Sequence, residues 1–445
     1  MTNILDDTRI AIGGVRDFAA NLASPSIRLG VTGLSRAGKT VFITALVHAL
    51  TTNARLPLLT AQSKNRIRRA WLEPQPDLGL PRFAYEDHIA ALTGPDRHWP
   101  ESTRRLSQLR LTLEVETRGI FGGERDPRQL HIDIIDYPGE WLLDLPLMKQ
   151  TYAQWSAATL KKHPTIPLEQ ADVPADETLA LAGAQIFTKH GQGTPGRFQM
   201  PGDLEGSPLL TFAPLKLQDG PIQPNSLAAL MSRRYEAYVA RVVKPFYRDH
   251  LARLDRQIVL VDTLTALNTG TASELSDALT DVLASFRQGA NSFTSRIFGK
   301  RVERILFAAT KADLLHHTSH DRLERILGKL VDTAATRAQF AGAQIAVTAI
   351  AAVRATKEAR VRDKGEELAC ITGVPEIGEK IGNQTFDGIS QAAIFPGDLP
   401  IEAARAFDGS LQEAVSFIRF RPPTHGLPHI RLDKALEFLI GDRLL

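Results

Sequence analysis

The most constraining feature of the chain is residues 33–40, Gly-Leu-Ser-Arg-Ala-Gly-Lys-Thr, which follow the pattern G-x-x-x-x-G-K-[ST]. Residues 27–32 before it are mostly apolar and predict a short strand, and apolar residues recur at helical spacing from Thr40 to Leu50. A glycine-rich turn between a strand and a helix points backbone N–H groups and the positive end of the helix dipole at one anion. The stretch therefore predicts a phosphate-binding loop at the start of an α/β sheet.

Each residue type in this loop has a physical role. Gly33 and Gly38 permit the tight turn and the close approach of the backbone to phosphate. The ammonium of Lys39 is expected to reach the β- and γ-phosphates, and the hydroxyl of Thr40 to hold Mg²⁺. The residues expected to contact the nucleotide from this segment are Gly33, Ser35, Arg36, Ala37, Gly38, Lys39, Thr40 and Val41.

A second motif follows the apolar strand predicted over residues 129–136. Asp136 ends that strand and Gly139 comes three residues later, which is the D-x-x-G arrangement of phosphate-loop GTPases. We expect Asp136 to bind Mg²⁺ through water and the N–H of Gly139 to meet the γ-phosphate. Glu140 stands where many GTPases have a water-orienting glutamine, and a carboxylate there is repelled by the γ-phosphate. Slow intrinsic hydrolysis is therefore expected.

A third motif, Thr310-Lys311-Ala312-Asp313, follows the apolar strand predicted over 303–309. GTPases place N-K-x-D at this point; the carboxylate of Asp313 can accept hydrogen bonds from guanine N1–H and the exocyclic amine, and the stem of Lys311 can lie over the purine. Thr310 departs from the usual asparagine and loses an amide. After the next strand, Thr348 and Ala349 are expected to touch the guanine oxygen through their backbone amides.

Residues 98–105 precede the strand of 108–116 and are expected to close on the phosphates. Thr103 is the candidate threonine for Mg²⁺ and the γ-phosphate, with Ser102 and Arg104 beside it and Trp99 shielding the nucleotide. Arg104 is a candidate for an arginine supplied in cis, or else a surface arginine or a ground-state phosphate contact. The candidate catalytic residues are Lys39, Thr103, Arg104 and Glu140, and the candidate metal ligands are Thr40, Thr103 and Asp136.

Composition narrows the class of protein. A formal net charge of +3 indicates no strongly electrostatic partner, so nucleic acid is not implied. The basic run 64–69 is interpreted as a solvated helix face, with phosphate or an anionic membrane as the sharper alternative. The single cysteine, Cys370, excludes an internal disulfide and fits a reducing compartment. We expect no membrane-spanning segment and no secretory signal.

The chain divides into five predicted parts. An amphipathic helix over 1–25 either docks on the body or contacts a membrane surface or partner. The fold expected is a three-layer α/β phosphate-loop domain whose mostly parallel sheet has an antiparallel edge, made by a hairpin of 108–116 and 129–136. The nucleotide-binding domain is split into 26–140, with a long insertion carrying helix-like pieces at 61–72 and 84–92, and 257–350, with a helix expected at 272–288. A helical insertion occupies 141–256 and a small β-containing region 351–445.

The chain resembles the YcjX-like family of bacterial Ras-like GTPases over nearly its whole length. The resemblance rests on residues 33–40, on Trp99-Pro100 followed by Ser102-Thr103, on Asp136-Tyr137-Pro138-Gly139-Glu140-Trp141, and on residues 310–313. It implies a Ras-like G domain in a cytoplasmic protein that binds GTP or GDP with Mg²⁺, is associated with a stress response, and is linked to an inner-membrane partner.

Two function classes are open on these motifs. The first is a GTP-hydrolysing, Mg²⁺-dependent switch, and the second is a nucleotide-gated binding module that scarcely hydrolyses. An ATPase or kinase is less favoured, because Asp313 suits guanine and no H-R-D catalytic-loop signature is present.

Overall fold

The computed structural model describes residues 25–33, 36–101, 105–116, 127–162, 171–191, 207–218, 220–268, 302–340, 342–363, 365–407 and 417–445. The N-terminal amphipathic helix and the helix expected at 272–288 lie outside these residues. In the part described, no helix has the length and apolar character needed to cross a membrane.

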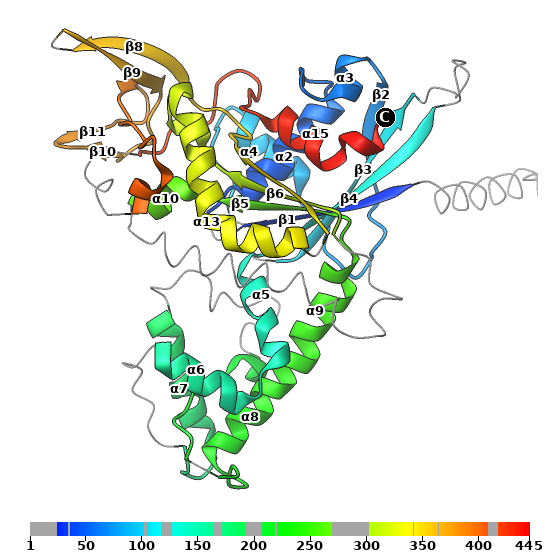
Figure 1. Ribbon diagram of the computed structural model, residues 1–445, viewed down its shortest axis with the longest axis vertical. Helices are drawn as coiled ribbons and strands as arrows, with labels where there is room; N and C mark the ends of the chain where they lie inside the picture. The colour runs from blue at the N-terminus through cyan, green and yellow to red at the C-terminus, as the bar shows by residue number, and fades with distance from the viewer. Residues whose placement is uncertain are drawn as a thin grey trace, which may run out of the picture.

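A seven-stranded sheet forms the centre of the described chain, in the order β2-β3-β4-β1-β5-β6-β7 (Figure 1). β1 pairs in parallel with β4 on one side and β5 on the other, and β6 and β7 continue the parallel run. The strands are β1 Ser26–Gly33, β2 Ile67–Glu73, β3 Ser107–Val115, β4 Arg128–Asp136, β5 Arg256–Val261, β6 Arg304–Ala309 and β7 Gln344–Ala349. The predicted α/β class and mostly parallel sheet are confirmed.

The antiparallel edge differs from its prediction. β3 and β4 do form the expected hairpin, but β4 lies inside the sheet and a further strand, β2, pairs antiparallel with β3 at the edge. The helix predicted over 61–72 is therefore wrong beyond α3, Thr60–Ser63. The basic run is not a helix face: Arg68 and Arg69 pair with Glu116 and Glu114 across the edge. Non-local pairing with β3 overrides the local helical pattern.

Helices cover both faces of the sheet and make it the middle of three layers (Figure 1). The hydrophobic core on one face joins β1, β3 and β4 to α2, α4 and α15, and the core on the other face joins β5 and β6 to α10 and α13. The bounds are α2 Lys39–Thr51, α4 Tyr85–Thr93, α10 Thr263–Asn268, α13 His320–Phe340 and α15 Leu432–Ile440. Strands covered on both faces explain the continuous apolar run of β5.

The helical insertion hangs below one end of the sheet (Figure 1) and has an aromatic core of its own. Its helices are α5 Glu140–Leu143, α6 Tyr152–Lys162, α7 Glu177–Gly191, α8 Leu227–Tyr238 and α9 Lys244–Asp249. Between α8 and α9 the helix is interrupted by a π-helical turn, Val239–Val243, just before Pro245. Proline removes a backbone donor and clashes with the preceding turn, which accounts for the interruption.

The C-terminal region begins with a small antiparallel sheet, β12-β9-β8, and a short β10–β11 pair. The bounds are β8 Lys357–Asp363, β9 Glu366–Gly373, β10 Lys380–Ile381, β11 Gln384–Thr385 and β12 Ala392–Ile394. Cys370 is buried in β9. Residues 417–420 form no strand, and Phe420 makes an isolated bridge to Pro375.

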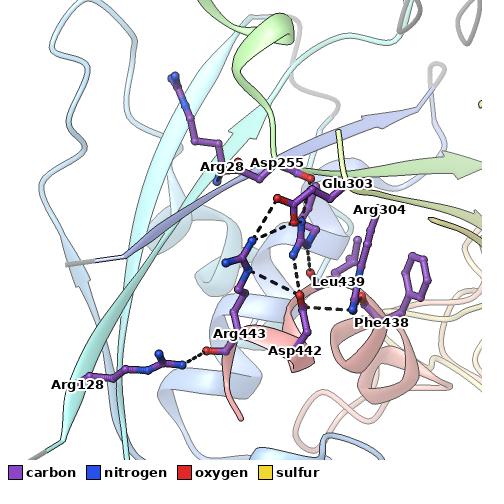
Figure 2. A network of polar contacts seen from close by, with 10 residues as sticks. Arg28, Arg128, Asp255, Glu303, Arg304, Phe438, Leu439, Asp442 and Arg443 are labelled. Carbon is purple, nitrogen blue, oxygen red and sulfur yellow. Dashed lines mark hydrogen bonds and ion pairs between the residues drawn. The ribbon is translucent and has the colours of Figure 1, made fainter. Parts of the chain in front are cut away.

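The chain then returns to the sheet through α15, and ion pairs such as that of Arg443 with Glu303 hold it there (Figure 2). Arg256 at the start of β5 is fully buried and pairs with Glu303 and Asp442. Its Nε also donates to the carbonyl oxygen of Leu439 at 2.9 Å. Arg443 pairs with the same Glu303 at 3.0 Å. A buried arginine is tolerated only when its charge and donors are satisfied, so this network explains why the end of the chain closes against the sheet.

Candidate functional site

A cavity of about 970 Å³ opens at the carboxyl ends of the parallel strands. This is the edge at which open α/β sheets bind their ligands, and the volume is within the range of small-molecule sites. The lining comes from distant parts of the chain: 36–42, 98–101, 260–262, 264–266, 310–311, 313–314, 350–353, 355, 376 and 417–420.

The first wall is the turn from β1 into α2. Gly38 has φ +85° and is the residue before α2, which has no side-chain cap at its N-terminus. A Cβ at Gly33 would lie 2.6 Å from the carbonyl oxygen of Leu260 in β5, so only glycine fits there. The Nζ of Lys39 donates to the carbonyl oxygen of Gly33 at 2.9 Å. The Lys39 residue as a whole is 7% exposed. The described part of this loop ends at a helix N-terminus without a side-chain cap, a type of backbone that can receive an anion.

The candidate Mg²⁺ ligands come from α2 and from the neighbouring strand. Thr40 lines the cavity and is buried. Asp136 is buried at the end of β4, where it pairs in register with Val31 of β1, two residues before Gly33. Gly139 is the residue before α5. Asp136 and Gly139 are not part of the cavity lining, although the sheet brings their segment to the same edge.

A second wall of the cavity is the Thr310–Asp313 motif, which follows β6, two strands away from β1 in the sheet. Asp313 is 5% exposed, and one carboxylate oxygen accepts a hydrogen bond from the backbone N–H of Ala355 at 2.9 Å. Burial raises the pKa of Asp313 to about 6, and the Ala355 hydrogen bond opposes that rise. Lys311 has a left-handed backbone and its ammonium pairs with Asp262 at 2.5 Å. Lys311 and Asp313 therefore both line the cavity.

Thr348 and Ala349 lie in β7 and are 1% and 0% exposed. Neither is in the cavity lining, and the N–H of Ala349 lies 3.3 Å from the carboxylate of Glu324. The four residues that follow, 350–353, line the cavity instead. The wall expected from the loop after β7 is therefore made slightly further along the chain.

Trp99 lines the cavity, as do His98, Pro100 and Glu101. Its indole Nε1–H donates to the carbonyl oxygen of Phe420 at 2.7 Å, and residues 417–420 line the cavity beside it. The C-terminal region therefore supplies part of the wall. Of the remaining predicted residues, Ser35, Ser102, Thr103 and Arg104 lie outside the described residues, as does the side chain of Glu140.

Sequence reasoning missed the contributions of Asp262, of 350–353 and of 417–420. Asp262 carried a usable signal, because it directly follows the apolar strand β5 as Asp136 follows β4. The 417–420 segment carried none, since its place in the cavity depends on contacts with Trp99, more than 300 positions away.

The helical insertion meets the site through the segment after β4. The hydroxyl of Tyr137 donates to the side chain of Gln257 at 2.6 Å, and its ring packs on Phe246 of α9. Trp141 packs edge-on against the same Phe246, with centroids 5.0 Å apart. The motif that begins at Asp136 is therefore continuous with the aromatic core of the insertion.

Comparisons with known proteins agree with this architecture. Residues 27–444 match the YcjX-like family, DUF463. "Ras-like GTPase YcjX" of Escherichia coli (strain K12) is 36% identical, over 94% of this chain and 96% of that protein. "Ras-like GTPase YcjX" of Shewanella oneidensis is 34% identical, over 95% of each chain.

One solved structure also aligns, the signal recognition particle receptor SRb-GTP/SRX complex from Chaetomium thermophilum. The alignment covers 73% of this chain and 93% of that one, at 14% identity and a TM-score of 0.27, a similarity too low to carry an argument. The family match and the two relatives, in contrast, cover almost the whole chain, and they show that this protein belongs to the YcjX-like family.

Proposed function

We propose that the protein binds guanine nucleotides with Mg²⁺ and hydrolyses GTP slowly, as a nucleotide-dependent switch. One observation carries the proposal: residues 36–42 of the phosphate loop and Asp313 line a single cavity. The names of the two relatives, both Ras-like GTPases, support it.

At the phosphate end, the proposal gives Lys39 and the first backbone amides of α2 the role of holding the β- and γ-phosphates. Lys39 would exchange its hydrogen bond to Gly33 for contacts with phosphate oxygens. Arg36, Ala37, Gly38 and Val41 would form the surrounding cradle, since all four line the cavity.

Thr40 and Asp136 fit a hard cation, because a hydroxyl and a carboxylate are the oxygen donors that Mg²⁺ prefers. Both are buried and come from neighbouring elements of one sheet edge. When bound, Mg²⁺ would supply positive charge that offsets the charge on the β- and γ-phosphates. The backbone N–H of Gly139 would donate a hydrogen bond to the γ-phosphate.

At the base end, Asp313 would read the donor edge of guanine and Lys311 would lie along the purine ring. Asp262 would orient Lys311 through their ion pair. The backbone of 350–353, which directly follows Thr348 and Ala349, would meet the base oxygen, and Trp99 would cover the nucleotide. Adenine lacks the N1–H and exocyclic donor pattern that an ionised Asp313 recognises.

Calorimetry tests the binding proposal. The parent protein should bind GDP in the presence of Mg²⁺ more tightly than it binds ADP. Asp313→Asn should lower the affinity for GDP and raise the affinity for xanthosine diphosphate. Lys39→Ala should cost about 2–5 kcal/mol of nucleotide binding, because it removes a charge-assisted partner in a desolvated site. Thr40→Ala should lower the affinity only when Mg²⁺ is present. Equal affinity for ADP and GDP would contradict guanine recognition.

Hydrolysis is proposed to be slow because Glu140 replaces the usual glutamine. In this proposal Thr103 closes on Mg²⁺, and Arg104 stabilises the charge that develops during phosphoryl transfer. Single-turnover assays at saturating GTP test each role. Thr103→Ala should impair the Mg²⁺-dependent state. Arg104→Ala should lower the rate more than the affinity, by up to ~10³-fold if it acts in cis. A fall in affinity alone would make Arg104 a binding residue. Ser102, in the same segment, is proposed to contact the nucleotide beside it.

The second candidate is a nucleotide-gated binding module with negligible hydrolysis. It is favoured by the size of the two regions outside the G domain, which offer large surfaces for a partner. Turnover that never exceeds that of Lys39→Ala, with normal GTP affinity, would select this alternative.

The proposed setting is the cytoplasm, in a stress-linked role with an inner-membrane protein as partner. A pull-down with the protein held by a GTP analogue, compared with its GDP state, tests for that partner. Recovery of an inner-membrane protein only in the analogue state is the expected result. Equal recovery in both states would contradict a switch.

A further inference from the structure

Outside the nucleotide cavity, three potential metal ligands gather between the base-end loop and the C-terminal sheet. His316 and His317 follow Asp313 by three and four positions, and Glu358 is the second residue of β8. One ring nitrogen from each histidine and one carboxylate oxygen of Glu358 all lie within 4.8 Å of one another. No other such group occurs in the described residues.

The three side chains already lie close to one another. His317 Nδ1 lies 2.8 Å from Glu358 Oε2, and the two imidazole rings have centroids 4.2 Å apart. Arg354 donates to the other carboxylate oxygen, Oε1, at 3.2 Å, which fixes the orientation of Glu358. The hydroxyl of Thr318 lies 3.1 Å from His316 Nδ1. Such outer contacts are typical of metal centres, where they set the orientation of the ligands.

Burial differs usefully among the three ligands. His316 is 5% exposed, whereas the side chains of His317 and Glu358 are 56% and 30% exposed. A tetrahedral zinc site holds its ligand atoms roughly 3.5 Å apart. Rotation of the exposed His317 and Glu358 side chains can therefore close the present spacing around an ion, while His316 stays in its buried position.

We propose that His316, His317 and Glu358 form a binding site for a first-row divalent transition-metal ion such as Zn²⁺. Two imidazoles and one carboxylate suit zinc, nickel or cobalt, whereas Mg²⁺ and Ca²⁺ prefer oxygen donors alone. Three protein ligands leave a fourth position for water. The ion would tie the loop that carries Asp313 to β8, and the two residues just before β8, Ala355 and Thr356, already hydrogen-bond to Asp313.

Zinc titration of the full chain tests the site, with any purification tag removed, in competition with a chromophoric chelator and in excess Mg²⁺. The parent should bind one equivalent of Zn²⁺. Glu358→Gln and His317→Ala should each weaken that binding by about tenfold or more. Both changes are at exposed positions, so folding is preserved even if His316→Ala unfolds the protein.

Matched controls are available on the same hairpin and elsewhere. Glu367 lies on β9 and pairs only loosely with Arg360, and His425 is an exposed histidine. Glu367→Gln and His425→Ala should bind zinc as the parent does. Zinc affinity that is unchanged in both Glu358→Gln and His317→Ala, or that is abolished by Mg²⁺, would overturn the proposal.

Discussion

The two regions outside the nucleotide-binding domain meet the candidate site in different ways. The C-terminal region meets it by polar contact: Ala355 and Thr356 hydrogen-bond to Asp313, and Phe420 accepts a hydrogen bond from Trp99. The helical insertion meets it through apolar packing of Phe246 on the segment after Asp136. In the proposed function, the C-terminal region would therefore lie beside the base and the insertion behind the phosphates.

This difference has a functional consequence. All guanine nucleotides share the base, so contacts at the base end should set affinity and release rate for GDP and GTP alike. Only GTP carries the γ-phosphate, so the segment after Asp136 should respond to the difference between the two states. We expect the C-terminal region to hold the nucleotide and the insertion to respond to its hydrolysis.

The largest expected effect comes from removing one buried ring in each region. Phe246→Ala removes the ring that contacts Tyr137 and Trp141, and should destabilise the insertion by about 3–5 kcal/mol. GTP turnover should fall while GDP affinity is kept. Phe386, buried in the core beside Ile371 and Phe420, is the matched position in the C-terminal region. Phe386→Ala should speed GDP release with less effect on single-turnover hydrolysis, as measured by stopped-flow release and quench assays.

The next effect concerns the charge of Asp313. Burial raises its pKa to about 6, so the folded protein binds a proton more tightly than the unfolded chain does. The stability from this group is present at low pH and is lost as the pH rises through about 6. Guanine binding favours the ionised carboxylate, so GDP should lower this pKa. Carboxyl ¹³C chemical shifts, assigned with the Asp313→Asn variant, measure this pKa. An ordinary aspartate pKa for Asp313 in the nucleotide-free protein would contradict this expectation.

A smaller effect separates two tryptophans. Trp99→Phe keeps a ring but removes the hydrogen bond to Phe420, which should cost about 0.5–1.5 kcal/mol and speed GDP release a few-fold. Trp141→Phe keeps the packing on Phe246 and should leave GDP release unchanged. Release of a fluorescent GDP analogue measures both. Equal acceleration by the two variants would remove the distinction between the regions.

The smallest change concerns one hydroxyl. The side chain of Thr356 donates to the carbonyl oxygen of Asp313, and Thr356→Val keeps the shape while removing that donor. Release of GDP should quicken by about as much as in Trp99→Phe, or less, because a single neutral hydrogen bond is lost. Thr372, whose hydroxyl bonds to Lys357 at an exposed position, offers the control Thr372→Val, which should release GDP at the parent rate.

The sequence predicted the parts of this molecule that depend on local pattern. The strand–turn–helix around residues 33–40 and the strands ending at Asp136 and Ala309 follow from periodicity and glycine chemistry. β2 was missed because its basic, half-buried residues have no strand signature until they pair with β3. The wall at 417–420 was missed because tertiary contacts alone bring it to Trp99.

Hydrogen–deuterium exchange tests the division between the two regions most directly, on the full chain without nucleotide, with GDP, and with a non-hydrolysable GTP analogue. The account predicts that GDP and the analogue protect Ala355 to Asp363 equally, relative to the free protein. It predicts that α8 and α9 change protection only between GDP and the analogue. Equal protection of α8 and α9 by GDP and by the analogue would contradict this division. A difference in the protection of β8 between the two nucleotides, without a difference in α9, would contradict it as well.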